Sequence, residues 1–347
     1  MFEDLLTKYG ISAEMDSKEI AKQLTKERNR RQSIIDNSDD NEYKTELLKE
    51  LAEIDATINY YSSLGNIGAT GITRDGATTD TPEIDFEKEY DRATELLATP
   101  DYEKGIRLLE ELASQGDVNS MRRIGGLYYE GNRVSQSYEK AFEWWMKAAE
   151  LGDAKAENTI GTCYMNGYGV GIDNEKAAEW WMKAAEQGFA PSQDCIGNCY
   201  FFGKGVEVDK EKAAYWWKKA AEQGLASAQY DLGNCYSNGY GVGIDKEKAA
   251  EWYKKAAEQG LASAQYNLGT CYLDGDGVGI DNEKAAEWFK KAAEQGDVEA
   301  QFNLGNCYYN GIGVGIDREK AILWFRKAAV QGDEDAQYSL RVLGETW

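Results

Sequence analysis

The sequence contains no histidine, and this absence removes several chemistries at once. A Ser-His or Cys-His nucleophile pair, a histidine general base and a His-ligated zinc site all depend on the imidazole. The segment Ser137-Tyr138-Glu139-Lys140 fits an S-x-x-K pattern, but no S-D-N or K-T-G element accompanies it. Ser137 is better interpreted as a helix N-cap. We therefore predict no catalytic residues and no enzyme, and a hydrolase is the weakest alternative.

Proline is also scarce, with 3 residues among 347, whereas glycine is abundant, with 36. Few prolines suit helices, and many glycines imply regular breaks between them. No stretch approaches the roughly 18 consecutive apolar residues that a membrane-spanning helix needs. The acidic start, Met1–Asp4, does not resemble a secretory signal. The expectation is an all-α cytoplasmic protein that does not bind membranes.

Positive charge is in deficit, because 39 Lys and Arg face 61 Asp and Glu, for a net charge of -22. An acidic surface repels the phosphates of nucleic acids and of anionic lipids. We therefore predict no nucleic-acid partner. The acidity permits a basic protein partner, although it also serves solubility alone.

Cysteine and aspartate recur in register, yet neither set indicates a metal or disulfide site. Five cysteines share one helical position: Cys163, Cys199, Cys235, Cys271 and Cys307. Packed helices lie about 10 Å apart, beyond the reach of a disulfide, so these thiols are expected to be buried. Aspartate recurs at Asp173, Asp209, Asp245, Asp281 and Asp317. One carboxylate per repeat is too sparse for calcium, and helix capping explains it. We predict no metal and no cofactor.

A repeat of 36 residues dominates the sequence. It is marked by seven evenly spaced glycines: Gly116, Gly152, Gly188, Gly224, Gly260, Gly296 and Gly332. Each unit indicates two helices. In the first, helix A, Ala228, Leu232 and Tyr236 lie on one face, and Gly239 ends the helix.

The second helix of each unit, helix B, begins at a capping aspartate such as Asp245. Its predicted core face carries Ala249, Trp252 and Ala256, with Tyr253 beside Trp252. A single hairpin of this size cannot bury enough apolar surface to fold alone. The units must therefore stack on one another as an α-solenoid.

The repeats and the remaining segments predict three parts. Residues 1–63 form a small helical hairpin module, and residues 64–83 form a flexible linker rich in Gly and Thr. The solenoid covers 84–347, with a degenerate first hairpin at 84–116, six full repeats at 117–332 and a capping helix A at 333–347. About fifteen helices are expected in the repeat region.

The repeated motif, A-x-Y-x-L-G-x-x-Y-x-x-G-x-G-V-x-x-D-x-x-K-A-x-x-W-x-x-K-A-A-E-Q-G, resembles the Sel-1-like repeat family, which is related to tetratricopeptide repeats. The resemblance covers about 84–347. It implies a right-handed superhelix of helical hairpins that acts as a non-catalytic scaffold or adaptor and binds a partner polypeptide in its concave groove. It does not identify the partner.

Residues 1–63 are similar in layout to a J-domain, but the His-Pro-Asp tripeptide of that family is missing. The resemblance suggests an alternative function, a chaperone-linked adaptor, and an unrelated hairpin explains the segment equally well. Lys22, Lys26 and Arg30 share one helix face and form a candidate basic docking patch, for which a plain solvated face is the other interpretation.

Analogy with tetratricopeptide repeats places the partner-binding residues on one face of helix A. Asparagine can hydrogen-bond an extended peptide through both its donor and its acceptor, and aromatic rings supply contact area. The alternative is that these rings only pack between helices. The candidate groove residues are Arg122, Asn158, Asn198, Tyr230, Asn234, Tyr266, Phe302, Asn306 and Tyr309.

Overall fold

The computed structural model describes Ile20, Gln23, Leu24, Ile54 and residues 85–347. The chain divides into two compact units, Met1–Pro82 and Glu83–Trp347, and the second is described below. The J-like layout of 1–63, the linker and the docking patch of Lys22, Lys26 and Arg30 lie outside the described residues.

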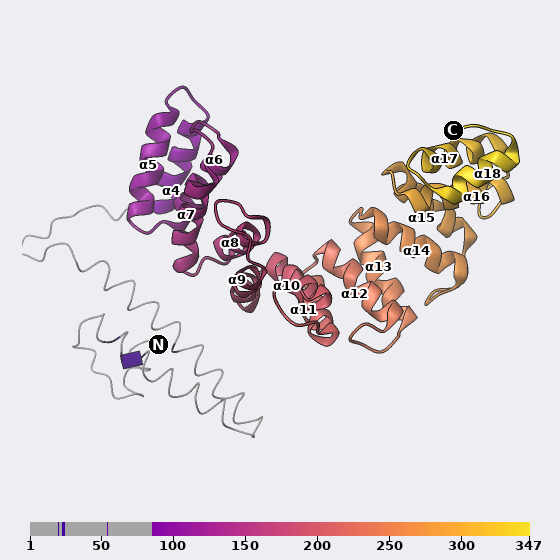
Figure 1. Ribbon diagram of the computed structural model, residues 1–347, viewed down its shortest axis with the longest axis horizontal. Helices are drawn as coiled ribbons and strands as arrows, with labels where there is room; N and C mark the ends of the chain where they lie inside the picture. Colours follow the sequence, from indigo (N-terminus) through magenta and orange to yellow (C-terminus); the bar gives the residue numbers. More distant parts are fainter. Residues whose placement is uncertain (1–19, 21–22, 25–53, 55–84) are drawn as a thin grey trace, which may run out of the picture. The chain divides into compact units, whose positions relative to one another are not determined.

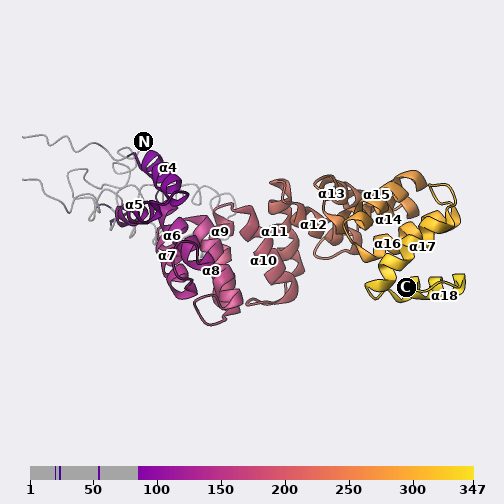
Figure 2. The ribbon, with the colours of Figure 1, turned by 90° about the horizontal axis from the view of Figure 1, so that it is seen from above.

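Residues 85–347 contain fifteen α-helices and no strand, which confirms the all-α prediction for this part. The helices follow one another in chain order, and each packs mainly on its neighbours in the sequence (Figures 1 and 2). They pair as successive hairpins of helix A and helix B, an α-solenoid. The helices are α4 (Phe86–Leu97), α5 (Tyr102–Ser114), α6 (Val118–Glu130), α7 (Tyr138–Glu150), α8 (Ala154–Asn166), α9 (Asn174–Glu186), α10 (Ala190–Phe202), α11 (Lys210–Glu222), α12 (Ala226–Asn238), α13 (Lys246–Glu258), α14 (Ala262–Asp274), α15 (Asn282–Glu294), α16 (Val298–Asn310), α17 (Arg318–Val330) and α18 (Glu334–Leu343).

Glycine and aspartate set the helix boundaries as predicted. Gly239 ends α12 in the left-handed conformation, with φ 76°. The Asp245 carboxylate accepts a hydrogen bond from the free main-chain N–H of Lys248 at 3.0 Å and thereby caps α13. Ser137 does the same for Lys140 at 3.2 Å, which confirms its interpretation as an N-cap. The unit therefore ends and restarts its helices through local chemistry alone.

The predicted core face of helix B needs one correction. Ala249 and Ala256 are buried, but Tyr253 fills the core at 4% exposure and Trp252 is only partly buried. The ring of Tyr253 lies against Gly233 of α12, where an added Cβ would come within 2.6 Å of it. Helix A and helix B thus approach closely because glycine makes room for the aromatic ring.

Two contacts recur between successive units along the solenoid. The second glycine of the turn, such as Gly241 with φ 70°, lies directly against the main-chain carbonyl of Lys210 in the preceding unit. The amide of Gln229 donates to the carbonyl of Ala221 at 3.2 Å and accepts from Gln259 at 2.8 Å. This amide relay links α11, α12 and α13 across the unit boundary.

A third contact differs from junction to junction. At one junction Tyr129, Tyr138 and Tyr168 form an aromatic trio, with ring centroids 5.3–5.5 Å apart. The equivalent residues two units later are Phe201, Lys210 and Tyr240, and the Lys210 ammonium lies 4.3 Å from the Tyr240 ring centroid. In the next junction they are Ser237, Lys246 and Asp276, and Lys246 lies 3.0 Å from the Asp276 carboxylate. These three junctions therefore each have their own matched chemistry.

Candidate functional site

The nine predicted groove residues all lie on helix A of successive units, along the surface that we call the helix A face. All are partly buried except Tyr309, which is 45% exposed. They are distributed as Arg122 on α6, Asn158 on α8, Asn198 on α10, Tyr230 and Asn234 on α12, Tyr266 on α14, and Phe302, Asn306 and Tyr309 on α16.

The asparagines in the middle of this face are occupied by contacts within the protein. Asn158 accepts from the Ser192 hydroxyl at 2.8 Å, and Asn234 accepts from the Tyr253 hydroxyl at 2.8 Å. Asn198 donates its amide to a main-chain oxygen of its own helix at 3.0 Å. These side chains stabilise the stack of hairpins, so less of their hydrogen-bonding capacity is free for a peptide than the sequence suggests.

The aromatic residues of the helix A face pack on rings of helix B and keep one edge exposed. The ring centroids of Tyr230 and Tyr253 are 6.1 Å apart. The same arrangement recurs for Tyr266 over Phe289 at 6.0 Å and for Phe302 over Phe325 at 5.8 Å. Each ring thus packs between helices and is still only partly buried, and its contact with a partner stays a prediction.

A cavity of about 200 Å³ opens at the C-terminal end of the helix A face. Two candidate residues, Asn306 and Tyr309, line it. Tyr338 and Val342 of α18 border it and are 64% and 65% exposed. The full lining is Asn306, Tyr309, Asn310, Phe325, Tyr338, Ser339, Val342 and Leu343. The structure therefore gathers exposed aromatic surface beside Asn306 at this end, whereas the Asn310 amide already donates to the main-chain oxygen of Asn306 at 3.1 Å.

The early end of α18 accounts for the open side of this cavity. The preceding helices A from α6 to α16 have 13 residues each, whereas α18 has 10 and ends at Gly344 with φ 74°. One turn of helix that would continue beside α16 is therefore missing. Gly344 is the sequence signal for this cavity, since it stands where α12 has Tyr236.

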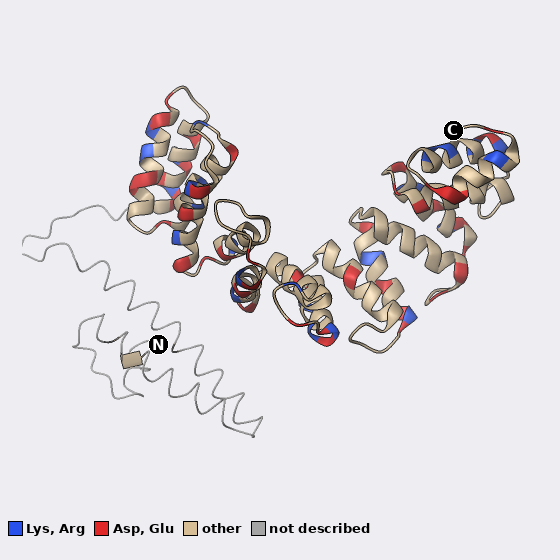
Figure 3. Ribbon diagram, in the orientation of Figure 1, with Lys and Arg blue, Asp and Glu red and all other residues tan. Residues whose placement is uncertain are grey.

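The helix A face carries far less charge than helix B. The helices α12, α14 and α16 contain one charged residue each: Asp231, Asp274 and Glu299. In Figure 3, α14 is accordingly drawn in the neutral colour up to its C-terminal end. Helix B is rich in Lys and Glu, which pair along the helix, as between Lys254 and Glu258 at 3.9 Å. From α12 to α16 the helix A face is thus a sparsely charged, aromatic surface of a strongly acidic protein.

Two carboxyl groups lie close together in the middle of this face. Asp194 of α10 accepts from the Ser227 hydroxyl at 2.9 Å. Burial raises the pKa of Asp231 on α12 to about 7, and the neighbouring Asp194 charge adds to this rise. Sequence reasoning missed Asp231, although Asn267 and Asn303 stand at the equivalent positions and mark it as unusual.

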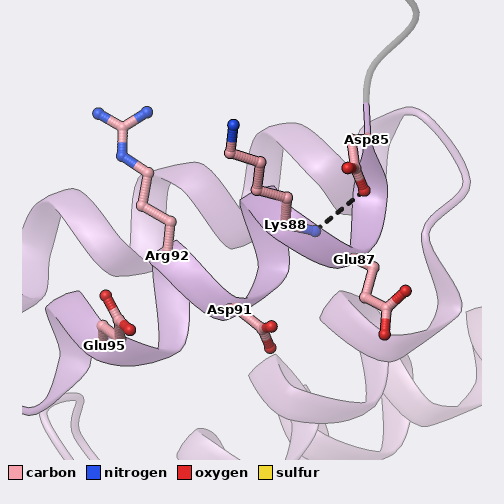
Figure 4. A pocket seen from close by; sticks show the side chains of 6 residues that line it. All are labelled: Asp85, Glu87, Lys88, Asp91, Arg92 and Glu95. Atoms are coloured by element: carbon pink, nitrogen blue, oxygen red, sulfur yellow. Dashed lines mark hydrogen bonds between the residues drawn. The ribbon is translucent and has the colours of Figure 1, made fainter.

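A second surface hollow, on α4, does not have the features of a binding site. Its six lining residues alternate in charge, and their side chains diverge along one helix (Figure 4). The main-chain N–H of Lys88 donates to Asp85 at 3.1 Å, and Arg92 pairs with Glu89 at 3.2 Å. These local contacts explain the charged residues without a ligand.

The cysteines are free thiols, and all but Cys195 are buried, as predicted. Burial raises the pKa of Cys163 and Cys235 to about 12, so these thiols stay protonated near neutral pH. Within the described residues no group of three or more Cys, Asp or Glu side chains could hold a metal ion. No helix there is long and apolar enough to cross a membrane.

The hairpin stack and the recurring junction contacts define a helical-repeat protein. The Sel1 repeat family matches the chain seven times, at residues 96–117, 118–153, 154–189, 196–225, 226–261, 262–297 and 298–333. The chain therefore belongs to the Sel1 repeat family, as the motif indicated. The J-domain resemblance of residues 1–63 is not borne out.

Solved structures support the same fold. A protective antigen of uropathogenic Escherichia coli with an SLR fold is 37% identical, with a TM-score of 0.66 over 70% of this chain. The aligned part spans 53% of that protein, about half its length. A Sel1 repeat protein from Oxalobacter formigenes is 32% identical, with a TM-score of 0.61, over 69% of this chain and 96% of that one. The comparison with curated proteins found no match.

Proposed function

We propose that the protein is a scaffold that binds a partner polypeptide along its helix A face. Sel1 repeat proteins in general are protein-interaction scaffolds that are typically not catalytic. The supporting observation is the cavity at the C-terminal end, where Tyr309 and Tyr338 are exposed beside Asn306 and Asn310. Aromatic side chains with a rigid ring and a polar tip are the usual anchors of protein interfaces.

The composition of the cavity indicates what it binds. Its lining carries no charged side chain, and its volume of about 200 Å³ is that of one large side chain. An apolar or aromatic residue of the partner would fill it, while the Asn306 amide hydrogen-bonds the adjacent main chain. The asparagines nearer the middle of the face take part less, because Asn158 and Asn234 are already hydrogen-bonded within the protein.

A peptide library displayed on phage and panned against the full chain tests this proposal. We expect enriched peptides to share one large apolar residue and to lose at least about tenfold in affinity when Tyr309 and Tyr338 are both changed to Ala. The matched control is Tyr215→Ala, because Tyr215 is 52% exposed on α11, a helix B. Equal loss in both variants, or none in either, would refute the assignment of the cavity.

A further inference from the structure

Five helix A glutamines make one hydrogen bond in common, and four of them share a second, which provides an internal reference for this position. Each donates its side-chain amide to the carbonyl of an alanine eight residues earlier, at 3.1–3.2 Å. Where a helix B follows this helix A, the amide oxygen also accepts a hydrogen bond from the glutamine that ends that helix B, at 2.8–2.9 Å. The five residues are Gln193, Gln229, Gln265, Gln301 and Gln337.

Glu157 of α8 occupies this position in the unit 154–189. It is 5% exposed and accepts from the Gln187 amide at 2.6 Å, which reproduces the acceptor half of the relay. The carbonyl eight residues earlier is that of Ala149 on α7, and an ionised carboxylate has no hydrogen to donate to it. Only the protonated acid has both the acceptor and the donor that glutamine supplies at the other junctions.

The surroundings of Glu157 favour the neutral form. Burial raises its pKa, and the Gln187 hydrogen bond and the Lys183 charge on α9 oppose this rise only in part. Asp153 at the start of α8 and Glu186 on α9 add negative charge, which also raises the pKa. Asp153 is itself paired with Arg122 of α6 at 3.2 Å. By analogy with the glutamine junctions, the group that α7 offers to this position is the uncharged Ala149 main chain.

We propose that Glu157 is a proton-dependent joint between the units 118–153 and 154–189. Its hydrogen bonds to both units are complete when its carboxyl carries a proton, and the joint is weakened when the carboxyl ionises. The later junctions carry glutamine at this position and the preceding unit carries Met121, so none of them has a carboxyl there. The joint would let mild acidity stiffen the packing between these two units. The proposal does not depend on where a partner binds.

The sign of the pH dependence follows from the direction of the shift. Because the folded protein holds the proton more tightly than the unfolded chain, the stabilisation is full below the ordinary glutamate pKa. It is lost as the pH rises through the raised pKa of the folded state. Glu157→Gln should remove this dependence, since it restores the amide of the other units.

Hydrogen exchange of the full chain at pH 5 and pH 8, corrected for intrinsic rates, tests the joint. At pH 8, we expect amides of α7 and α8 in the unaltered protein to exchange roughly tenfold faster than in Glu157→Gln for each unit of pKa shift. At pH 5 the exchange rates of these amides should be similar in the two proteins. Amides of α14 and α15 should not differ between them at either pH.

The matched reverse variant is Gln193→Glu, which adds a carboxyl at the next junction. It should give α9 and α10 the same acceleration at pH 8 and leave them close to the unaltered protein at pH 5. Equal protection of α7 and α8 in the unaltered protein and Glu157→Gln at pH 8 would overturn the proposal. A Gln193→Glu variant with no change between the two pH values would overturn it as well.

Discussion

At the scale of single residues, the tightest spatial requirement lies at the second glycine of the A–B turn. Gly169, Gly205, Gly241, Gly277 and Gly313 all have positive φ and lie against a main-chain carbonyl at the start of the preceding helix B. A side chain there meets two obstacles at once: a backbone conformation unfavourable to L residues, and a neighbouring peptide group that cannot rotate away. The glycine of this turn is therefore a junction residue as much as a turn residue.

Gly241→Ala is expected to destabilise the protein by at least about 2 kcal/mol, because the new methyl group collides with the carbonyl of Lys210. Gly243→Ala is the matched control two residues away, since a Cβ there meets no atom within 4 Å. Urea unfolding followed by circular dichroism measures both. A Gly241→Ala variant as stable as Gly243→Ala would contradict the packing described here.

The carboxyl group of Asp231 predicts a second pH effect, on global stability. Its folded pKa of about 7 lies above the ordinary value of 3.8, so the ionised form destabilises the folded state. Asp231→Asn should be more stable than the unaltered protein at pH 8, by on the order of 2 kcal/mol, and equally stable near pH 4. The difference should grow between these limits in a urea titration series. A constant difference across pH would rule out titration of Asp231 as its origin.

Much of the residue-level detail follows from the sequence, and the exceptions have physical reasons. The caps Ser137 and Asp245 are predictable because capping is local chemistry. The burial of Tyr253 instead of Trp252 was not predictable, because both residues, three and four positions after Ala249, flank the same helix face. The special role of Glu157 depends on a carbonyl in another helix, which periodicity does not reveal.

At the scale of helices, the contact between helix A and helix B is made by different side chains in the two halves of the solenoid. In the first half a tryptophan of helix B fills this contact, and two of the three donate the indole N–H to a main-chain oxygen of helix A, as Trp181 does to Asn158 at 3.1 Å. In the second half the tryptophan is replaced by Tyr or Phe, and the short polar residue above it becomes aromatic, as in Tyr266 over Phe289. The side-chain volume that helix B loses is thus replaced by a larger side chain on helix A.

This exchange of volume predicts coupling between positions 158 and 181. Asn158→Tyr alone should destabilise the protein by about 1–3 kcal/mol, because the large Trp181 ring leaves no room for a second ring above it. Adding Trp181→Phe should recover most of this loss, since the pair then matches Tyr266 and Phe289. A double-mutant cycle in urea measures the coupling. Additive effects of the two changes would contradict the compensation.

The last helix shows what the sequence indicates about an element and what it leaves open. A final helix A without a helix B is predicted from residues 333–347, and α18 is that helix. The cavity beside it was not predicted, because it needs three helices in place and the early stop at Gly344. The candidate groove residues were located by analogy with a repeat family, and which of their side chains are already hydrogen-bonded became clear only from the neighbouring helices.

At the scale of the whole repeat region, each hairpin contacts its neighbours in the chain, so stability accumulates along one dimension. Deleting one complete unit, residues 226–261, should therefore leave a folded helical protein. The matched deletion of residues 226–243, half a unit, removes a helix A from its partner and should cause loss of cooperative unfolding. Circular dichroism and thermal unfolding distinguish the two. Unfolding of both variants would show that contacts beyond neighbouring units are essential.

The contact between Lys246 and Asp276 shows that deleting a whole unit would still leave a matched junction. Removing residues 226–261 brings Lys210 next to Asp276 and Gly277, so an ammonium still faces a carboxylate and a glycine still faces the carbonyl. Near-identical coding segments tend to recombine out of register, which adds or removes whole copies. A chain whose junctions tolerate this can change length within a lineage while remaining folded, and the reach of its binding surface can vary without new side chains.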